Sequence, residues 1–344
     1  MLQNARVLRS EFVPRELQHR DHEHSALTTA LNPLTRGEPA DPVIITGPTG
    51  TGKTTLSKYT LDRLQENALG IETAVINCWQ NHSSYRALFR ILEHLGRTVD
   101  VHRQSTPQDV LLERLRDYND DCVVVLDEAD QLDDKGIIYD LRRLPQFTLV
   151  LIANREADLF SDVDDRLQSR LHGTQTIQFD PYSVDPLVAI LQARSDAAFA
   201  HPDAIATGLL QDIADAAAGD ARVAITILRE AAKAAEQTDR DHITTGDVEA
   251  AIPEGRQAVR NETKESLKPT QRILYEIVED YVTANGEPMP PSELYAAYQE
   301  RVEDPVGNRQ VRRHLNKLDH YELITIQGSS RDRRYDLPTH NHPG

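Results

Sequence analysis

Hydrophobic positions in the first half of the chain form short continuous runs, separated by stretches in which apolar residues recur at helical spacing. The runs are rich in β-branched side chains, which is typical of strands buried on both faces. The stretches 53–67 and 84–95 have the spacing of amphipathic helices. Alternation of strands and helices predicts a doubly wound parallel sheet, an α/β fold. The predicted strands are 43–45, 73–76, 123–126, 148–152 and 176–179.

The same pattern divides the chain into segments. The second half is Ala-rich and helical, and it ends with three predicted helices followed by two short strands, which is the order of a winged helix. Prolines and polar residues mark the boundaries. We expect an N-terminal arm (1–42), an α/β domain (43–180), a helical region (181–252), a helix end plus linker (253–269), a winged helix (270–337) and a disordered tail (338–344).

A glycine-rich motif lies between the first predicted strand and helix. Residues 47–54 read GPTGTGKT and match G-x-x-x-x-G-K-[ST]. Glycines let backbone N–H groups turn toward phosphate oxygens, and the next helix presents its positive N-terminus to them. Lys53 should reach the β- and γ-phosphates, and Thr54 should bind Mg²⁺. The predicted nucleotide-binding residues of this loop are Gly47, Gly50, Thr51, Gly52, Lys53, Thr54 and Thr55.

Polar side chains end two other predicted strands. Asp127 and Glu128 follow the buried run 123–126, so they should lie at the carboxyl edge of the sheet beside the glycine-rich loop. We expect Asp127 to hold Mg²⁺, partly through water, and Glu128 to orient an attacking water. Asn154 ends the next strand and can help to position that water. The alternatives are a solvated helix cap for the acidic pair and an ordinary turn residue for Asn154.

Two arginines, Arg166 and Arg170, lie one helical turn apart after these strands. Either could project across a subunit boundary toward the γ-phosphate of a neighbour. From the residues alone, a solvated helix face is the favoured interpretation of both.

Basic residues concentrate in the predicted winged helix. Residues 305–337 contain seven Lys and Arg against four Asp and Glu, a net charge of +3, which leaves −20 for the rest of the chain. Val311, Leu315 and Leu318 form a buried stripe, so the basic positions between them face outward, where a major groove could be read. The alternative is a winged helix that contacts proteins only. The predicted DNA-contacting residues are Arg309, Arg312, Arg313, Asn316, Arg331, Arg333 and Arg334.

Charge and composition indicate the cellular environment in which the protein works. The chain has 55 Asp and Glu against 38 Lys and Arg, and only seven of these are Lys. Such a surface indicates adaptation to a salt-rich cytoplasm, where ions screen self-repulsion; an ordinary acidic protein from a GC-rich genome is the alternative. Because there is no long apolar run, no signal peptide and only two cysteines, Cys78 and Cys122, we expect a cytoplasmic protein without disulfides or a membrane partner.

Several further motifs follow one another along the chain. They read FVP at 12–14 and HRD at 19–21, VINC at 75–78, DEADQL at 127–132, IAN at 152–154, DRLQSRL at 165–171, FDPY at 179–182, ILQAR at 190–194 and GDAR at 219–222. In this order the chain resembles the AAA+ ATPases and, within them, the archaeal origin-recognition and cell-division-cycle type replication initiators. Asp164, Asp165 and Arg166 stand where the family more usually has Asp-Pro-Arg, and the compact chain resembles a divergent haloarchaeal paralogue.

The resemblance implies roles for individual residues. Val13 and Pro14 would contact adenine. Asn154 would be the sensor-1 residue, at the end of the family's sensor-1 strand. The domain 43–180 would be the AAA+ nucleotide-binding domain and 181–252 its lid. Family membership further implies nucleotide contacts from Tyr182 and Arg194 in the lid, a γ-phosphate contact from Arg222, and an arginine finger at Arg170.

The implied function is an initiator that binds duplex DNA at a replication origin and uses ATP binding and slow hydrolysis as a switch, with ATP or ADP and Mg²⁺ as cofactors. It would be a weak ATPase, with ATP hydrolysis acting as the switch. Replicative helicase and other initiator subunits are implied as further partners. The family's extra DNA-contacting helix in the AAA+ domain has no assignment here. The alternatives are a transcriptional or signalling regulator of the AAA+ type, and a loader without DNA sequence preference.

Overall fold

The computed structural model describes residues 1–68, 70–99, 101, 106–160, 173–328 and 332–338. The predicted residues Arg166, Arg170 and Arg331, and the tail from residue 339, lie outside this part. The chain divides into two units, Met1–Arg256 and Gln257–Gly344. Each unit is described by itself.

A parallel five-stranded sheet forms the centre of the first unit, as the hydrophobic pattern predicts. The strand order is β2-β3-β4-β1-β5, so β4 lies between β1 and β3. The strands are β1 (Val43–Thr46), β2 (Glu72–Asn77), β3 (Cys122–Asp127), β4 (Phe147–Ala153) and β5 (Gln175–Gln178).

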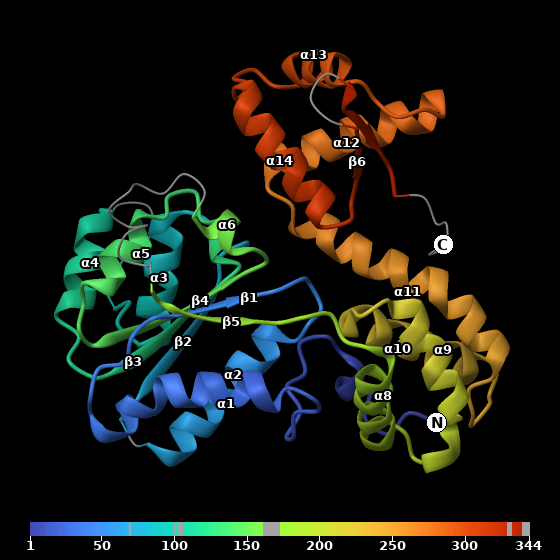
Figure 1. Ribbon diagram of the computed structural model, residues 1–344, viewed down its shortest axis with the longest axis horizontal. Helices are drawn as coiled ribbons and strands as arrows, with labels where there is room; N and C mark the ends of the chain where they lie inside the picture. Colours follow the sequence, from blue (N-terminus) through green and yellow to red (C-terminus); the bar gives the residue numbers. More distant parts are fainter. Residues whose placement is uncertain (69, 100, 102–105, 161–172, 329–331, 339–344) are drawn as a thin grey trace. The chain divides into compact units, whose positions relative to one another are not determined.

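Helices cover both faces of this sheet, which gives three layers (Figure 1). Alternate residues of β3 enter different layers: Val123 and Val125 pack with α1 (Asp21–Leu31) and α2 (Lys53–Asn67), while Val124 and Leu126 pack on the opposite side. All six residues of β3 are buried. The helices on that opposite side are α3 (Ser84–His94), α4 (Gln108–Arg116) and α5 (Gly136–Arg142).

A group of helices after β5 forms the lid. Its core holds 22 buried residues, and it includes Val7 and Leu8 from the N-terminal arm. The arm therefore contributes to the lid core and also connects the lid to α1. The other elements of the first unit that the structure describes are η1 (Ala5–Leu8), η2 (Asn32–Arg36), η3 (Ala129–Gln131), α6 (Glu156–Leu159), α8 (Val184–Ala198), η4 (Pro202–Ala204), α9 (Thr207–Ala217), α10 (Ala221–Gln237) and the start of α11 (Thr245–Ser266).

The structure differs from the expected linker over 253–269. Helix α11 continues through Pro253 to Ser266, and the division between the two units falls within it, after Arg256. At Gly255 a Cβ would lie 2.7 Å from Cγ1 of Ile227, so α11 and the helix that contains Ile227 pack closely at that point. Only the short turn before Pro269 separates α11 from the next helix.

The second unit has the helix and strand order of a winged helix. Val311, Leu315 and Leu318 are buried, as their spacing predicts. The antiparallel pair β6–β7 is extended by Met289, whose N–H donates to the carbonyl of Tyr335 at 2.7 Å. The elements are α12 (Pro269–Asn285), α13 (Pro291–Arg301), α14 (Asn308–His320), β6 (Thr325–Gln327) and β7 (Arg334–Asp336).

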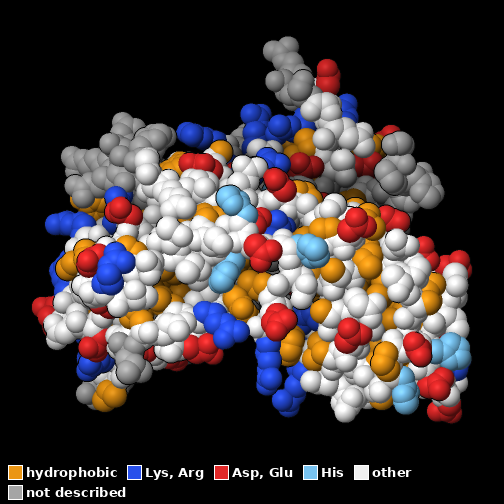
Figure 2. Space-filling model, turned by 60° about the horizontal axis from the view of Figure 1, so that its bottom comes forward, with side chains coloured by type: hydrophobic (Ala, Val, Ile, Leu, Met, Phe, Trp, Pro, Cys, Tyr) orange, Lys and Arg blue, Asp and Glu red, His pale blue; other side chains and the backbone are white. Residues whose placement is uncertain are grey.

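Acidic side chains are scattered over the face of the molecule seen in Figure 2, between hydrophobic and basic ones. The full chain has a net charge of −17. Within the described ranges, no helix is both long and apolar enough to cross a membrane.

Because β3 is buried on both faces, Val124→Ala should lower the free energy of unfolding by about 2–3 kcal/mol, from lost apolar burial and the cavity left behind. Val99→Ala is the matched control, since Val99 is 73 % exposed and its truncation should change that free energy by less than about 0.5 kcal/mol. Urea unfolding followed by circular dichroism measures both. Equal losses in the two variants would contradict the packing described.

Candidate nucleotide site

The glycine-rich loop connects β1 to α2, as the motif predicts. Gly47 and Gly52 have positive φ values of 147° and 90°. At Gly47 a Cβ would lie 2.2 Å from the carbonyl oxygen of Phe179, so no larger residue fits there. The backbone of the loop is thus held against the strand end that leads into the lid.

Lys53 is buried at the start of α2. Its Nζ donates to the carbonyl oxygens of Gly47 and Pro48, each at 2.6 Å, and to Oδ1 of Asn154 at 3.2 Å. Burial lowers the pKa of Lys53 to about 8, although the charge of Asp127 opposes that shift. The ammonium group is held by neutral oxygens and has no direct carboxylate partner in the described residues, which suits it to an anionic ligand.

Thr54 and Asp127 meet at the carboxyl edge of the sheet. The Thr54 hydroxyl donates to Oδ2 of Asp127 at 2.7 Å. Burial raises the pKa of Asp127, and the Thr54 hydrogen bond opposes this shift. A hydroxyl and a carboxylate are oxygen ligands of the kind that Mg²⁺ prefers, and a nearby cation would favour the charged carboxylate. The pair therefore fits a Mg²⁺ ion. Among the described residues there is no group of three or more His, Cys, Asp or Glu that could hold a metal ion without a hydroxyl ligand.

Glu128 follows Asp127 in a strained turn. Its φ is 55°, in the left-handed region that non-glycine residues rarely adopt. Such backbone strain is typical of functional positions. Burial, and then the charges of Asp127 and Asp130, raises the pKa of Glu128. A raised pKa makes the ionised carboxylate a stronger base, and nearby cations favour that ionised form, which is the one that can accept a proton from water.

Asn154 joins the loop to β4 and lies between the other two motifs in the sheet order. Its carbonyl oxygen accepts from the N–H of Gly47 at 3.2 Å, and its Oδ1 accepts from Lys53. Its Nδ2 is buried and has no hydrogen-bond partner in the described structure. This amide can donate to a ligand or a water beside Lys53.

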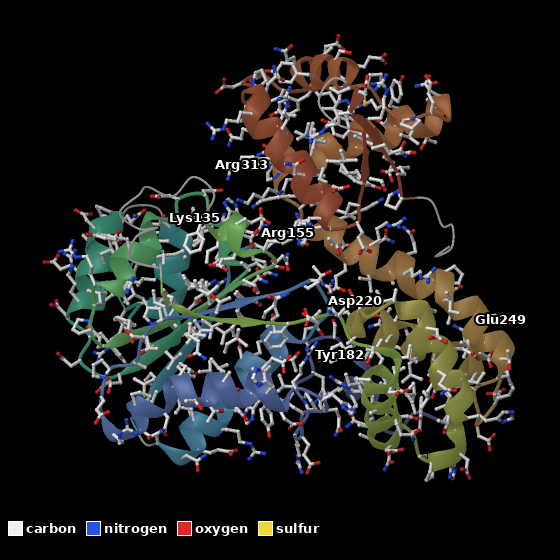
Figure 3. The ribbon with its side chains drawn as sticks, viewed as in Figure 1. Lys135, Arg155, Tyr182, Asp220, Glu249 and Arg313 are labelled. Atoms are coloured by element: carbon white, nitrogen blue, oxygen red, sulfur yellow. The ribbon has the colours of Figure 1, made fainter. Side chains whose placement is uncertain are left out.

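The lid contacts the glycine-rich loop directly. The N–H of Ala221 donates to the carbonyl of Gly50 at 3.0 Å. A Cβ on Gly50 would lie 1.9 Å from Oδ1 of Asp220, and one on Gly52 would lie 2.7 Å from the Tyr182 hydroxyl. Figure 3 labels Tyr182 and Asp220 on the side of the lid that faces the sheet. The positive φ values of Gly50 and Gly52, 72° and 90°, favour glycine at both positions, and the side chains of Asp220 and Tyr182 lie against them.

Arg222 lies on the same side of the lid. Its Nη2 is 3.3 Å from Oδ2 of Asp220, and its charge acts on the pKa values of both Lys53 and Glu128. The structure thus brings Arg222, Lys53 and Glu128 into one electrostatic cluster. A contact between Arg222 and a γ-phosphate stays a prediction.

Arg194 has different neighbours. Its guanidinium donates to the carbonyl oxygens of Val7 and Phe12 in the arm, at 2.6 and 2.9 Å. Val13 and Pro14, the predicted adenine contacts, follow Phe12 directly and are half-buried. A direct contact between Arg194 and a nucleotide stays a prediction.

Two residues absent from the predicted site belong to it geometrically. Asp220 accepts from the N–H groups of Arg222 and Val223, at 2.7 and 3.1 Å, and so caps α10 while it abuts the loop. Arg20 is buried, donates to the carbonyl of Asp180 at 2.7 Å and lies 4.0 Å above the ring of Tyr182. The position of Asp220 before a helix signals the cap, but no local signal gives its contact with Gly50.

The predicted DNA-contacting residues that the structure describes lie on α14 and at the start of β7. Arg309, Arg312 and Asn316 are exposed, and Arg313 lies one turn after Arg309. Arg334 is exposed and opens β7, directly after Arg333. Arg331 is in the segment outside the described residues. The arrangement is compatible with groove and backbone contacts, and DNA binding by these side chains stays a prediction.

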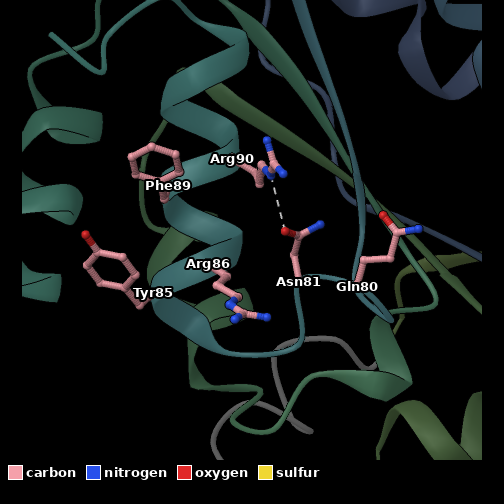
Figure 4. Close-up of a pocket in the computed structure, with 6 residues that line it drawn as sticks. All are labelled: Gln80, Asn81, Tyr85, Arg86, Phe89 and Arg90. Atoms are coloured by element: carbon pink, nitrogen blue, oxygen red, sulfur yellow. Dashed lines mark hydrogen bonds between the residues drawn. The ribbon is translucent and has the colours of Figure 1, made fainter. Parts of the chain in front are cut away.

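A separate cavity of about 360 Å³ lies beside α3 (Figure 4). Nε of Arg90 donates to Oδ1 of Asn81 across it at 3.3 Å. None of the predicted nucleotide-binding residues lines this cavity. Its lining residues are Gln80, Asn81, Tyr85, Arg86, Phe89 and Arg90.

Family models match both parts of the first unit. Residues 36–161 match the model of an AAA domain, and residues 188–253 match that of the Cdc6 AAA+ ATPase-type lid domain. Together with the parallel sheet and the glycine-rich loop, these matches define an AAA+ ATPase fold with a Cdc6-type lid. The predicted fold class is confirmed.

Individual relatives specify the family further. ORC1-type DNA replication protein 9 of Halobacterium salinarum is 46% identical over 338 residues, which cover 98% of this chain and 94% of the relative. ORC1-type DNA replication protein 1 of the same organism is 45% identical over 313 residues, 91% of this chain and 100% of the relative. The structure of the Aeropyrum pernix ORC1 protein in complex with DNA has a TM-score of 0.78 and 27% identity, and the match covers 98% and 93% of the two chains.

The chain therefore belongs to the family of ORC1-type DNA replication proteins. The predicted resemblance to archaeal replication initiators is confirmed, and the high identity to two haloarchaeal proteins agrees with the acidic, Lys-poor composition. Membership supports a role in the initiation of DNA replication.

The lowered pKa of Lys53 makes ATP affinity depend on pH. In the free protein Lys53 loses its proton as pH rises through about 8, whereas bound phosphates would hold the proton. Affinity should therefore be constant below pH 8 and fall above it, by up to about tenfold per pH unit, with proton uptake on binding. Titration calorimetry in buffers of different ionisation enthalpy measures both.

Lys53→Arg is the control for this prediction, because a guanidinium stays protonated throughout that pH range. This variant should bind ATP with an affinity that does not fall between pH 8 and about pH 9.5. An equal fall in the wild type and in Lys53→Arg would assign the pH dependence to another group.

Proposed function

We propose that this chain is an ATP-dependent DNA replication initiator that binds duplex origin DNA and regulates or loads the replication machinery. The observation that carries the proposal is the meeting of three elements at one edge of the sheet: Lys53 in the glycine-rich loop, Asp127 at the end of β3, and the lid segment with Asp220 and Arg222. Its place of action would be cytoplasmic DNA, with helicase and other initiator subunits as further partners.

Nucleotide binding follows from the charges at this edge. ATP would place its phosphates by the loop N–H groups and the ammonium group of Lys53, and Thr54 and Asp127 would hold Mg²⁺. The ion would neutralise part of the phosphate charge. The Aeropyrum pernix ORC2 protein, which has a similar fold, was solved as ADPNP and ADP complexes, and this supports an adenine nucleotide as the ligand.

The switch would operate through the lid. Asp220 and Arg222 form an ion pair at 3.3 Å beside Gly50, and a γ-phosphate would compete with Asp220 for the guanidinium. The lid would then hold different contacts with ATP and with ADP. Hydrolysis, slow in this proposal, would reset the lid after Glu128 accepts a proton from the attacking water.

The DNA contact would come from the second unit. The exposed basic and amide side chains of α14 lie on the side opposite the buried stripe, where they could meet base edges in a major groove. Arg333 and Arg334 would contact the phosphate backbone. The ORC1 protein of Aeropyrum pernix was solved in complex with DNA, which supports DNA as a partner of this chain.

Glu128→Gln tests the hydrolysis step. The amide keeps the size of the side chain but cannot accept a proton, so ATP affinity should stay within about twofold while turnover falls at least about 100-fold. Equilibrium binding and single-turnover hydrolysis with radiolabelled ATP measure the two quantities. Lys53→Ala is the matched control and should lose ATP binding itself. Turnover of Glu128→Gln at the wild-type rate would remove Glu128 from the mechanism.

Two arginine substitutions test the DNA contacts. Arg309→Ala should reduce the preference for origin over random duplex, by about 1–3 kcal/mol if a base contact is lost. Arg334→Ala should weaken both duplexes alike and lower the slope of log K against log salt by about 0.9, because one phosphate contact is lost. Fluorescence anisotropy across a salt series distinguishes these outcomes.

Arg301→Ala serves as the control for both substitutions. Arg301 is also exposed, but it lies on α13 and pairs with Asp280 at 2.7 Å. Its truncation should change neither the preference nor the slope. Identical effects of all three substitutions would indicate a general charge effect in place of a defined DNA interface.

A further inference from the structure

Arg194 is a buried cation whose described partners are backbone carbonyls. It is 7 % exposed within the lid, on α8. Its Nη1 and Nη2 donate to the carbonyl oxygens of Val7 and Phe12, and its guanidinium carbon lies 4.9 Å from the centroid of the Phe12 ring. No carboxylate contacts it in the described residues. Burial lowers the pKa of Arg194 to about 10.

These partners indicate that Arg194 holds the N-terminal arm in place against the lid. A guanidinium is a planar fork of donors, so it can hold two acceptors at a fixed separation. Here the two acceptors belong to one segment and bracket the end of η1 and the turn that follows it. An isolated buried cation is costly, and carbonyl dipoles together with the Phe12 ring reduce that cost.

Residues before Val13 are built into the lid. Val7 and Leu8 are 3 % and 0 % exposed and belong to the lid core. The N–H groups of Gln3 and Asn4 both donate to the carbonyl of Ala198, at 2.8 and 3.0 Å. This part of the arm therefore moves with α8 if the lid moves.

Beyond Phe12 the arm crosses to the sheet domain. Leu17 packs against the hydrophobic cluster that contains β1 and α2. Arg20 then donates to the carbonyl of Asp180 and to Oε1 of Glu23. Residues 13–20 therefore form a strap with one end fixed by Arg194 in the lid and the other by Arg20 at the sheet domain. Val13 and Pro14 lie at the lid end of this strap.

We infer that Arg194 is a positioning residue for the adenine base: it holds the strap so that Val13 and Pro14 can cover the base, and it contacts no phosphate. The inference rests on the proposed binding of ATP and on the predicted adenine contacts of Val13 and Pro14. The lid would then act on the nucleotide in two ways. Arg222 and Asp220 lie by the phosphate loop, whereas Arg194 would act on the base through the arm. Recognition of the base then depends on where the lid sits.

The test compares a ligand that has a base with one that lacks it. In the full chain, Arg194→Met should weaken the binding of Mg-ATP by about 10- to 100-fold, as loss of two charge-assisted hydrogen bonds predicts. The binding of magnesium tripolyphosphate should stay within about twofold. Competition against a fluorescent ATP analogue measures both affinities, and thermal unfolding checks that the variant is folded.

Two further variants sharpen the result. Arg194→Lys keeps the charge and the aliphatic stem but not the fork, so it should show a smaller loss that is still selective for ATP. Arg222→Met is the matched control on the same lid, and it should weaken ATP and tripolyphosphate by similar factors. If Arg194→Met fails to fold, the selectivity of Arg194→Lys decides the test.

Equal losses of ATP and tripolyphosphate in the Arg194 variants would overturn the inference, because they would place the guanidinium at the phosphates. Unchanged ATP affinity in a folded Arg194→Met variant would overturn it as well. Failure of the proposed function gives a different result: Lys53→Ala would then bind ATP as the wild type does, whatever the Arg194 variants do.

Discussion

The site depends on one buried ammonium group. Lys53 is enclosed by the carbonyls of Gly47 and Pro48 and by Asn154, and burial lowers its pKa to about 8. The order of the parallel strands creates this enclosure, since β4 brings Asn154 between the glycine-rich loop and Asp127. A buried cation surrounded by neutral oxygens favours an anion beside it. Phosphate oxygens match both the charge and the N–H groups of the loop.

The lid adds a second constraint on the same loop. Asp220 and the N–H of Ala221 contact Gly50, so the backbone that would cradle phosphates also supports the lid. The arm joins the lid through Arg194 and the sheet domain through Arg20. Loop, lid and arm therefore form one connected set of contacts around the proposed nucleotide, and a change at any of them can reach the other two.

Local sequence patterns predicted much of this structure. They could not predict the parts that depend on contacts between residues far apart in the chain. The continuous run 123–126 predicted a strand buried on both faces, and the motif 47–54 predicted the loop between β1 and α2. The bond from Arg194 to Val7 joins residues 187 positions apart, and no periodicity contains that information. The expected linker after Pro253 is instead helical: α11 contributes Val248 and Ala251 to the lid core and continues through the proline to Ser266, although proline usually breaks a helix.

Hydrogen–deuterium exchange of the full chain with and without Mg-ATP tests most directly whether loop, lid and arm form one nucleotide site. Exchange protection reports local opening of backbone hydrogen bonds. The account predicts that ATP slows exchange together in three separate segments: the loop at 47–54, the lid turn at 219–223 and the arm at 3–14. Protection confined to 47–54, with unchanged exchange in the lid turn and the arm, would contradict it.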